Sequence, residues 1–336
     1  MKNTHISLAH GSGGIESNAL IEEVIYSILG ELIVGGGEDA GVFGGAKQYA
    51  ISTDSYVVSP IFFSGGDIGK LCVCGSSNDV SMRGGRARYL SLGLILEEGF
   101  ALADLQRILH SIKAEALKGD LRLLSGDTKV VPRGNADKIY INSTAIGEMG
   151  QVDWSIKNIQ EGDEIIVSAP VGTHGAVIFC ARNEVALQSD LQSDCAQLYP
   201  LVESLHRYNV HTMRDATRGG VAAVLNEWSK SASVEIEIRT EAVPVLEKVR
   251  GVCEILGLDP LSLANEGVCV MAVPPSESKK VLESLRTHSL GTHSCVIGRV
   301  LRKVEDKKQA RVVSINAWGG KCYVEYPQGE LLPRIC

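Results

Sequence analysis

Four aspartates stand where their carboxylates can gather in one cleft. They lie at the ends of short apolar strands or in turns with small residues, within the segments GEDAG, STDS, SNDV and RDATRGG: Asp39, Asp54, Asp79 and Asp215. Converging carboxylates repel one another unless a divalent cation lies between them, and Mg²⁺ prefers hard oxygen ligands and often bridges to substrate phosphates. A single aspartate of this kind is more often a turn or helix cap. The four together, beside glycine-rich loops, favour a magnesium site.

Two further segments carry groups suited to phosphates. HGSGG (10–14) offers backbone N–H groups that a polyphosphate can approach, although it matches neither the Walker A motif nor GxGxxG. SGDTKV (125–130) follows a predicted strand, and Lys129 would balance charge on a transferring phosphoryl group. The alternatives are a flexible loop and a hairpin turn with a solvated lysine. The residues we assign to nucleotide binding are His10, Gly11, Ser12, Gly13, Gly14, Thr53, Asp127 and Thr128.

A glutamate and a cysteine are candidates for the chemistry itself. Glu266 precedes the apolar stretch VCVMAV, where partial burial would raise its pKa and suit it to act as a general base. A capping role for this glutamate is about equally compatible with the pattern. Cys336 is the last residue, and a terminal thiol on a Pro- and Gly-containing arm can enter a cleft. Arg334 would favour its thiolate and the terminal carboxylate would oppose it; the alternative is an incidental exposed cysteine.

Alternating strands and helices are predicted to position these groups, which indicates an α/β fold. The polar stretch 147–162 has no clear period and predicts a boundary between domains 1–150 and 151–326, followed by a mobile tail at 327–336 that carries the cysteine. We predict strands at 49–54, 89–96, 121–125, 138–146, 164–168, 234–238 and 268–273, and helices at 102–118, 176–182, 194–208 and 219–231.

The composition excludes several classes of protein. The chain has 336 residues, of which 44% are hydrophobic and 22% charged, so it can bury a large core. The net charge of −7 argues against nucleic-acid binding, which needs a surplus of Lys and Arg. We find no signal-peptide pattern and no apolar run of membrane-spanning length, and expect a cytoplasmic protein. The nine cysteines are scattered, so we expect most to be buried, reduced thiols.

The motifs together resemble the HypE family of hydrogenase maturation proteins, within the superfamily of aminoimidazole ribonucleotide synthetase and selenophosphate synthetase. The matching stretches span the whole chain, and the terminal PRIC distinguishes HypE proteins from their relatives. These stretches are LAHGSGG (8–14), STDSYVVSPIFFSGGDIGKL (52–71), NDV (78–80), YLSLGLILEEG (89–99), SGDTKVVPRG (125–134), RDATRGGV (214–221), RGVCEILGLD (250–259), NEG (265–267) and PRIC (333–336).

The resemblance implies an architecture and an activity. The N-terminal domain would pair across a homodimer into a β-barrel, beside a C-terminal α/β domain, with ATP and Mg²⁺ in the cleft between domains. Cys336 would receive a carbamoyl group from HypF, and ATP would drive dehydration of that group to a thiocyanate. The cyano group would pass to iron on the HypC–HypD complex, for the [NiFe] hydrogenase centre. Glu266 would be the base, with Lys129 balancing developing charge.

The sequence departs from the family pattern in two places. After NDV, the usual run of small residues is replaced by SMRGGRAR (81–88), which adds Arg83, Arg86 and Arg88. Thr173 replaces an acid before His174, which leaves the role of that position open. Two rival functions remain: a small-molecule synthetase of the same superfamily, which would not need its C-terminus, and a non-catalytic scaffold that docks through its tail, which would not turn over ATP.

Overall fold

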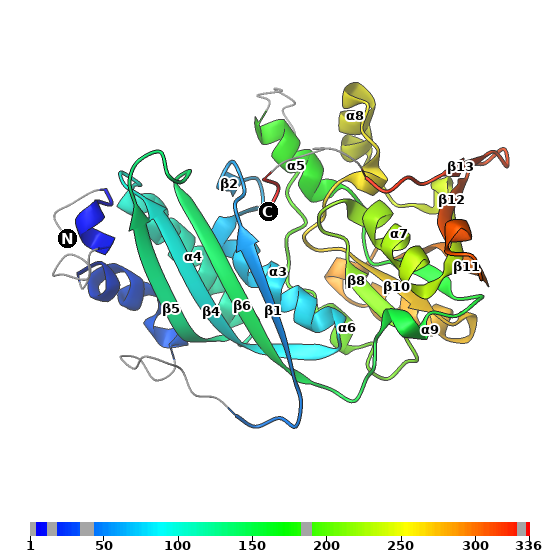
Figure 1. Cartoon of the computed structure of the whole chain (residues 1–336), viewed down its shortest axis with the longest axis horizontal. Coiled ribbons are helices and arrows are strands. Elements are labelled where there is room, and N and C mark those ends of the chain that lie inside the picture. Colours follow the sequence, from blue (N-terminus) through cyan, green and yellow to red (C-terminus); the bar gives the residue numbers. More distant parts are fainter. Residues whose placement is uncertain (1–4, 12–18, 34–43, 183–189, 328–333) are drawn as a thin grey trace.

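The N-terminal domain is built on a four-stranded sheet in the order β1–β6–β4–β5, in which only the pair β4–β5 is parallel. The computed structural model describes residues 5–11, 19–33, 44–182, 190–327 and 334–336 (Figure 1). Short helical turns at Leu8–Gly11 and Ile21–Leu32 precede the sheet. The elements of this domain are β1 (Tyr49–Tyr56), β2 (Phe62–Phe63), β3 (Gly66–Asp67), α3 (Ile68–Met82), β4 (Gly85–Glu97), α4 (Leu102–Lys118), β5 (Arg122–Val131) and β6 (Ile139–Met149).

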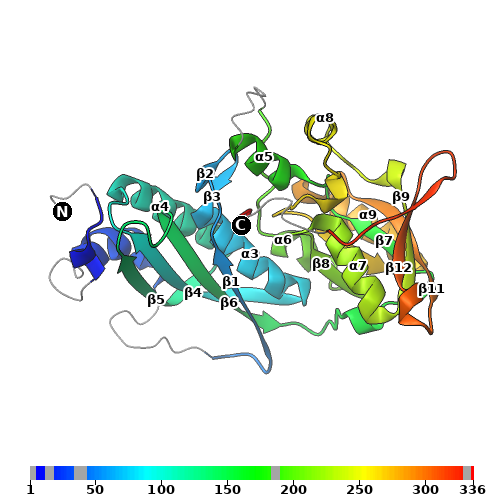
Figure 2. The ribbon, with the colours of Figure 1, turned by 45° about the horizontal axis from the view of Figure 1, so that its top comes forward.

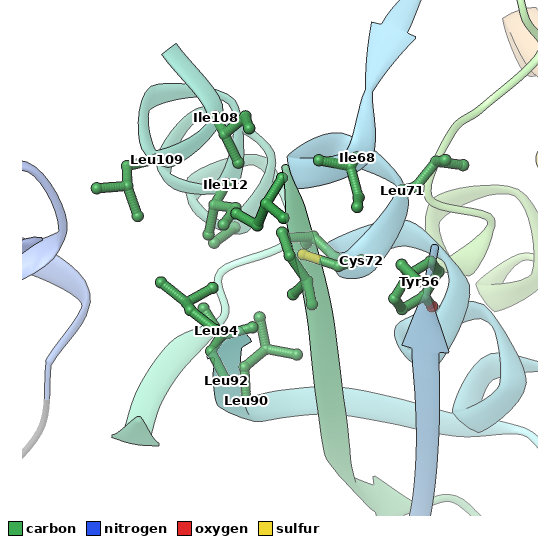
Figure 3. Close-up of a cluster of buried hydrophobic side chains, with 14 of the residues drawn as sticks. Tyr56, Ile68, Leu71, Cys72, Leu90, Leu92, Leu94, Ile108, Leu109 and Ile112 are labelled. Carbon is green, nitrogen blue, oxygen red and sulfur yellow. The ribbon is translucent and has the colours of Figure 1, made fainter. Parts of the chain in front are cut away.

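Helices α3 and α4 cover one face of this sheet (Figure 3). Asp67 caps α3, because its carboxylate accepts the N–H groups of Gly69 at 2.8 Å and Lys70 at 3.0 Å. Helix α3 is buried along nearly its whole length, whereas α4 is amphipathic and ends at Gly119, as its spacing predicts. Helix α3 therefore lies at the centre of the molecule and presents different faces to different neighbours.

The other face of the N-terminal sheet is open. Ile51 on β1 is 70% exposed and Ile95 on β4 is 40% exposed. The strand pairing places Ser55, Asn142, Gly93 and Asp127 in one row across all four strands of this face. The residues that the structure describes leave the side chains of Ile51 and Ile95 exposed, and the four strands they form do not close into a barrel.

The C-terminal domain contains a seven-stranded sheet in the order β13–β12–β9–β11–β7–β10–β8, with one parallel pair, β12–β9. One face packs against α7 and the other against α6 and α9, so the sheet is buried on both sides. Its elements are β7 (Glu164–Val167), α5 (Thr173–Arg182), α6 (Tyr199–Glu203), β8 (Thr212–Asp215), α7 (Gly220–Ala232), β9 (Val234–Arg239), α8 (Glu247–Leu256), β10 (Cys269–Val273), α9 (Pro275–Arg286), β11 (Cys295–Lys303), β12 (Arg311–Ile315) and β13 (Lys321–Tyr323).

Most elements predicted from the sequence are confirmed, but three predictions are wrong. The helix predicted at 194–208 is reduced to α6, and residues 190–198 form no regular secondary structure. Asp127–Lys129 lie inside β5 and not after a strand. Asp79 lies on α3, where burial on all sides hides the helical period from the sequence. In addition, β1 continues two residues beyond Asp54.

The C-terminus ends between the two domains (Figures 1 and 2). Ile335 is only 3% exposed and belongs to the core of the N-terminal domain, which also includes Ile178, Cys195 and Ala264 from the C-terminal domain. The last three residues are thus docked in this structure. The mobility predicted for the tail 327–336 stays a prediction.

All nine cysteines are free thiols, and five of them are buried, as expected. Within the described part of the chain, no helix is long and apolar enough to cross a membrane.

Candidate active site

The backbone of the last three residues pairs with the segment that follows β1. The N–H of Val57 donates to the carbonyl of Cys336 at 2.9 Å, and the N–H of Ser59 donates to the carbonyl of Arg334 at 3.2 Å. The Arg334 guanidinium donates back to the carbonyl of Val57 at 2.8 Å. These contacts fix the position of the terminal residue relative to β1 and hence to Asp54 on that strand.

Three cationic or aromatic side chains hold the docked tail in place. Arg334 also pairs with Asp137 at 2.7 Å, and Arg182 donates to the carbonyls of Ser59 and Arg334. His174 Nε2 lies 2.9 Å from the carbonyl oxygen of Ile335, and its Nδ1 lies 2.8 Å from the Ser193 hydroxyl. Because a carbonyl only accepts, His174 carries its proton on Nε2. Burial lowers the pKa of His174 to about 4, so the ring is neutral at physiological pH.

The Cys336 thiol lies in a largely buried and acidic environment. Burial raises the pKa of Cys336 to about 12, and the nearby carboxylates of Glu266, Asp54 and Asp215 act in the same direction. Arg218 is the cation that opposes this shift. The sequence suggested Arg334 for that role, but its guanidinium is directed to Val57 and Asp137 instead. In this position the unmodified sulfur is a thiol rather than a thiolate.

Glu266 is 3% exposed and stands in a turn directly before β10. Asn265 shapes this turn, because its side chain accepts the N–H of Gly172 at 2.6 Å and donates to the carbonyl of Ala216 at 2.8 Å. Burial raises the pKa of Glu266 well above its usual range, and Cys195 and Asp194 add to that shift. Glu266 Oε1 is buried without a hydrogen-bond partner. A carboxylate in such a site is a strong base toward a bound substrate.

Three of the four predicted metal ligands converge on this cleft. Asp54 and Ser52 on β1 point toward α3, where the Ser52 hydroxyl donates to Asp79 at 2.5 Å. Burial, reinforced by the charge of Asp79, raises the pKa of Asp215 to about 8. Burial also raises the pKa of Asp79, and Asp54 adds to this. Asp39 lies outside the described residues.

This acidic set fits a divalent cation that is completed by a substrate. Buried carboxylates with raised pKa values face each other, which is a strained arrangement that a cation would relieve. Among the described residues, no three His, Cys, Asp or Glu side chains form a ready-made metal cage. Mg²⁺ is usually held by one or two carboxylates plus phosphates, so such a cage is not required.

The other predicted nucleotide-binding residues do not reach this cleft in one chain. Lys129 and Asp127 pair with each other at 2.6 Å on the open face of β5, and Thr53 lies on that same face of β1. Thr128 is also on β5, at the sheet edge opposite Asp54, three strand spacings or roughly 14 Å away. His10 and Gly11 pack beside β5. Ser12, Gly13 and Gly14 lie outside the described residues.

Comparison with known proteins identifies the relatives of this chain. Family models for the N-terminal and C-terminal domains of AIR synthase related proteins match residues 37–149 and 160–310. The carbamoyl dehydratase HypE of Escherichia coli K12 is 40% identical over 340 residues, which covers 99% of both chains. The chain belongs to the HypE family. The Rhodobacter capsulatus HypE is also 40% identical, over all of this chain and 99% of its own length.

Solved HypE structures have the same fold. A structure of a hydrogenase maturation protein HypE in complex with ATP aligns with a TM-score of 0.93 at 41% identity, over 98% of this chain and 99% of that one. The HypE–HypF complex aligns with a TM-score of 0.79 at 38% identity, over 92% of this chain and 100% of that one. Thiamine monophosphate kinase of Aquifex aeolicus, at 18% identity and a TM-score of 0.61, shares the fold.

Several site residues of this HypE-family chain were not found from its sequence. No role was assigned to His174, Arg182 or Asp194 from the sequence, and only the folded chain brings them to the tail and to Glu266. The threonine that precedes His174 is buried at the start of α5. The arginines that depart from the HypE pattern lie away from the acidic set: Arg88 and Arg86 pair with Asp120, at 2.6 and 3.7 Å, and Arg83 with Asp153 at 4.0 Å.

Proposed function

We propose that this chain is an ATP-dependent carbamoyl dehydratase that converts a carbamoylated Cys336 to a thiocyanate. The product would supply the cyanide ligand for the iron of [NiFe] hydrogenase. The observation that carries this proposal is the docking of the terminal cysteine beside Glu266 and the acidic set. Membership of the HypE family, whose relatives include named carbamoyl dehydratases and an ATP complex, supports it.

The chemistry requires a better leaving group than hydroxide. The oxygen of the S-carbamoyl group attacks the γ-phosphorus of ATP, so an O–P bond forms as the bond to ADP breaks. Loss of phosphate from carbon, together with the N–H protons, then leaves S–C≡N. Glu266 is buried, lacks a partner on Oε1 and lies near the thiol, so it is placed to take a proton from the nitrogen.

Asp54, Asp79 and Asp215 would hold Mg²⁺ on the phosphates. The ion supplies charge neutralisation on the transferring phosphoryl group. The role of the chain is to keep these carboxylates, Glu266 and the sulfur in one water-poor cleft. Charge–charge attraction acts more strongly there than in bulk water.

Carbamoylation is expected to occur with the tail undocked. A thiol whose pKa is raised to about 12 is a poor nucleophile in the cleft, so the group should be accepted outside it. We propose HypF as the donor, which the HypE–HypF complex of a relative supports. The HypC–HypD complex is the proposed acceptor of cyanide, and the cytoplasm the proposed location.

We also propose that the protein acts as a homodimer whose N-terminal sheets pair through their open faces into a β-barrel. Ile51 and Ile95 give that face exposed apolar side chains that a second copy would cover. Lys129, Asp127, His10 and Gly11 do not reach the cleft of their own chain. In a dimer, these residues would complete the cleft of the partner chain.

The rival functions differ in what they need from the tail. A small-molecule synthetase would not need a C-terminus held by two backbone–backbone hydrogen bonds, the Arg334 and Arg182 side chains and His174. A scaffold would not turn over ATP. The test is the mass of the C-terminal peptide of HypF-carbamoylated protein before and after ATP. We expect loss of one water at Cys336, no such loss in Cys336→Ala, and normal loss in Cys322→Ala. Loss of water at another cysteine would refute the proposal.

A further inference from the structure

The dehydration needs a place for one proton. The nitrogen of the carbamoyl group loses two protons, and the balanced reaction gives ADP, hydrogen phosphate, thiocyanate and one free H⁺. One N–H proton therefore ends on phosphate and the other must leave the cleft. If Glu266 takes the first proton, it has to lose that proton before it can assist removal of the second. This requirement rests on the proposed function.

Asp194 is the acidic side chain built against Glu266. Its Oδ1 accepts the backbone N–H of Glu266 at 3.0 Å, and its Oδ2 is buried without a hydrogen-bond partner, as is Glu266 Oε1. Each of these buried carboxylates costs free energy when it carries charge, and protonation of either one reduces that cost. Burial raises the pKa of Asp194 to about 7, close to physiological pH.

The chain is shaped to hold these two residues together. The N–H of Ala196 donates to the carbonyl of Glu266 at 3.2 Å, so residues 194–196 run beside the turn that carries the glutamate. A side chain at Gly267 would overlap with the carbonyl of Asp194, so only glycine allows this approach. Asn78 on α3 anchors the segment from the other side, through the carbonyl of Ala196 at 2.9 Å and the N–H of Leu198 at 2.7 Å.

An open cavity lies beside the residues that directly follow Asp194. This cavity of about 450 Å³ is lined by Lys70, Cys195, Ala196 and Gln197, on the side of α3 that faces away from Asp79. Four groups oppose the effect of burial and lower the pKa of Asp194. They are the backbone N–H groups of Glu266, His174 and Asp194 itself, and the charge of Lys70. Lys70 thus lines the cavity and is close enough for its charge to act on Asp194.

We propose that Asp194 is a positioning and proton-accepting residue, which takes the first N–H proton from Glu266 and releases it to water in the cavity behind α3. The O–H bond on Glu266 breaks as the new O–H bond on Asp194 forms. Glu266 is then free for the elimination step. The cleft does not have to open to solvent between the two steps.

The test is Asp194→Asn in the HypF-carbamoylated full chain, with Asp190→Asn as the matched control. Asparagine still accepts the N–H of Glu266 but cannot take a proton. Asp190 is exposed and pairs with Lys248, outside the site. We expect ATP binding and carbamoylation to be retained and the maximal dehydration rate to fall by about a hundredfold. The rising limb of the pH profile should shift to lower pH, because a negative charge beside Glu266 is lost.

Three results for Asp194→Asn would overturn the proposal. The first is an unchanged dehydration rate with an unchanged pH profile. The second is a lower dehydration rate with no shift of the rising limb of the pH profile, and the third is a defect confined to ATP affinity. If Asp194→Asn does not fold, the relay can still be tested in the wild-type protein. In a single turnover with a pH indicator, a proton should reach solvent before thiocyanate appears, and simultaneous appearance would contradict the relay. Absence of any thiocyanate in the wild type would instead refute the proposed function itself.

Discussion

His174 Nε2 lies 2.9 Å from the carbonyl oxygen of Ile335, the residue directly before the terminal cysteine. This contact links α5 to the docked tail without touching the sulfur. It is therefore a means to change docking while leaving the chemistry of Cys336 intact.

We expect His174→Ala to favour the undocked tail. A lost hydrogen bond costs about 1 kcal/mol, which shifts the docking equilibrium by about fivefold. Alkylation of Cys336 should become faster by about that factor. The rate of ATP-dependent dehydration, measured at a low ATP concentration, should become slower. His293→Ala, at an exposed histidine, is the control. Equal alkylation rates in the two variants would show that this contact does not hold the tail.

The docked thiol should be far less reactive than an exposed one. Cys336 has its pKa raised to about 12, whereas Cys322 lies exposed on β13. Since the thiolate is the nucleophile, iodoacetamide at pH 8 should modify Cys322 at least about tenfold faster than Cys336. Peptide mass analysis over time measures both rates in one sample. Equal rates would mean that the tail is mostly undocked in solution.

The crowded aspartates predict a pH-dependent stability without metal. The pKa of Asp215 is about 8 when folded and near 4 when unfolded, so between these values the folded chain binds a proton that the unfolded chain does not. This contribution to stability is complete below about pH 4 and is lost as the pH rises to about 8. In EDTA at pH 8, Asp215→Asn should have a higher Tm than wild type.

Magnesium should act against that difference in Tm. Added Mg²⁺ and ATP should raise the Tm of the wild type at pH 8 more than that of Asp215→Asn, because the variant lacks one negative ligand. The same increase in both proteins would argue against Asp215 as a ligand.

The dimer proposal predicts complementation between chains. In a mixed dimer, a Lys129→Ala chain keeps its own Cys336, and a Cys336→Ala partner would supply Lys129. We expect thiocyanate on the Lys129→Ala chain in mixed dimers and much less in Lys129→Ala alone. Lys303→Ala, at an exposed position of the C-terminal domain, should behave as wild type. No gain in the mixed dimers would place Lys129 outside the partner site.

Sequence patterns predicted the structure correctly where neighbouring residues carry the signal. The 102–118 helix has an apolar stripe and a glycine end, and both are found in α4. NEG before an apolar run placed Glu266 at the mouth of a buried strand, as the structure shows for β10. Asp215 does end a strand, as expected.

The features that were not predicted from the sequence depend on contacts between residues far apart in the chain. Residues 194–198 have a composition compatible with a helix, but contacts with Asn78 and with the backbone of Glu266 hold them in an irregular segment. The grouping of Lys129 with Asp54 failed within one chain, because sheet order places β5 and β1 at opposite edges. Neither the pairing of residues 57–59 with 334–336 nor the role of His174 has a local signature.

The account depends most on Glu266 acting as the base on a docked, carbamoylated Cys336. Its most direct test is a single-turnover reaction of carbamoylated Glu266→Gln with ATP, followed by the mass of the C-terminal peptide. Glutamine keeps the size of the side chain but does not accept a proton, so binding should survive and the rate should fall by ~10²–10⁴-fold. Glu254→Gln, at an exposed glutamate, should lose one water at the wild-type rate. Loss of water from Cys336 at the wild-type rate in Glu266→Gln would contradict the account.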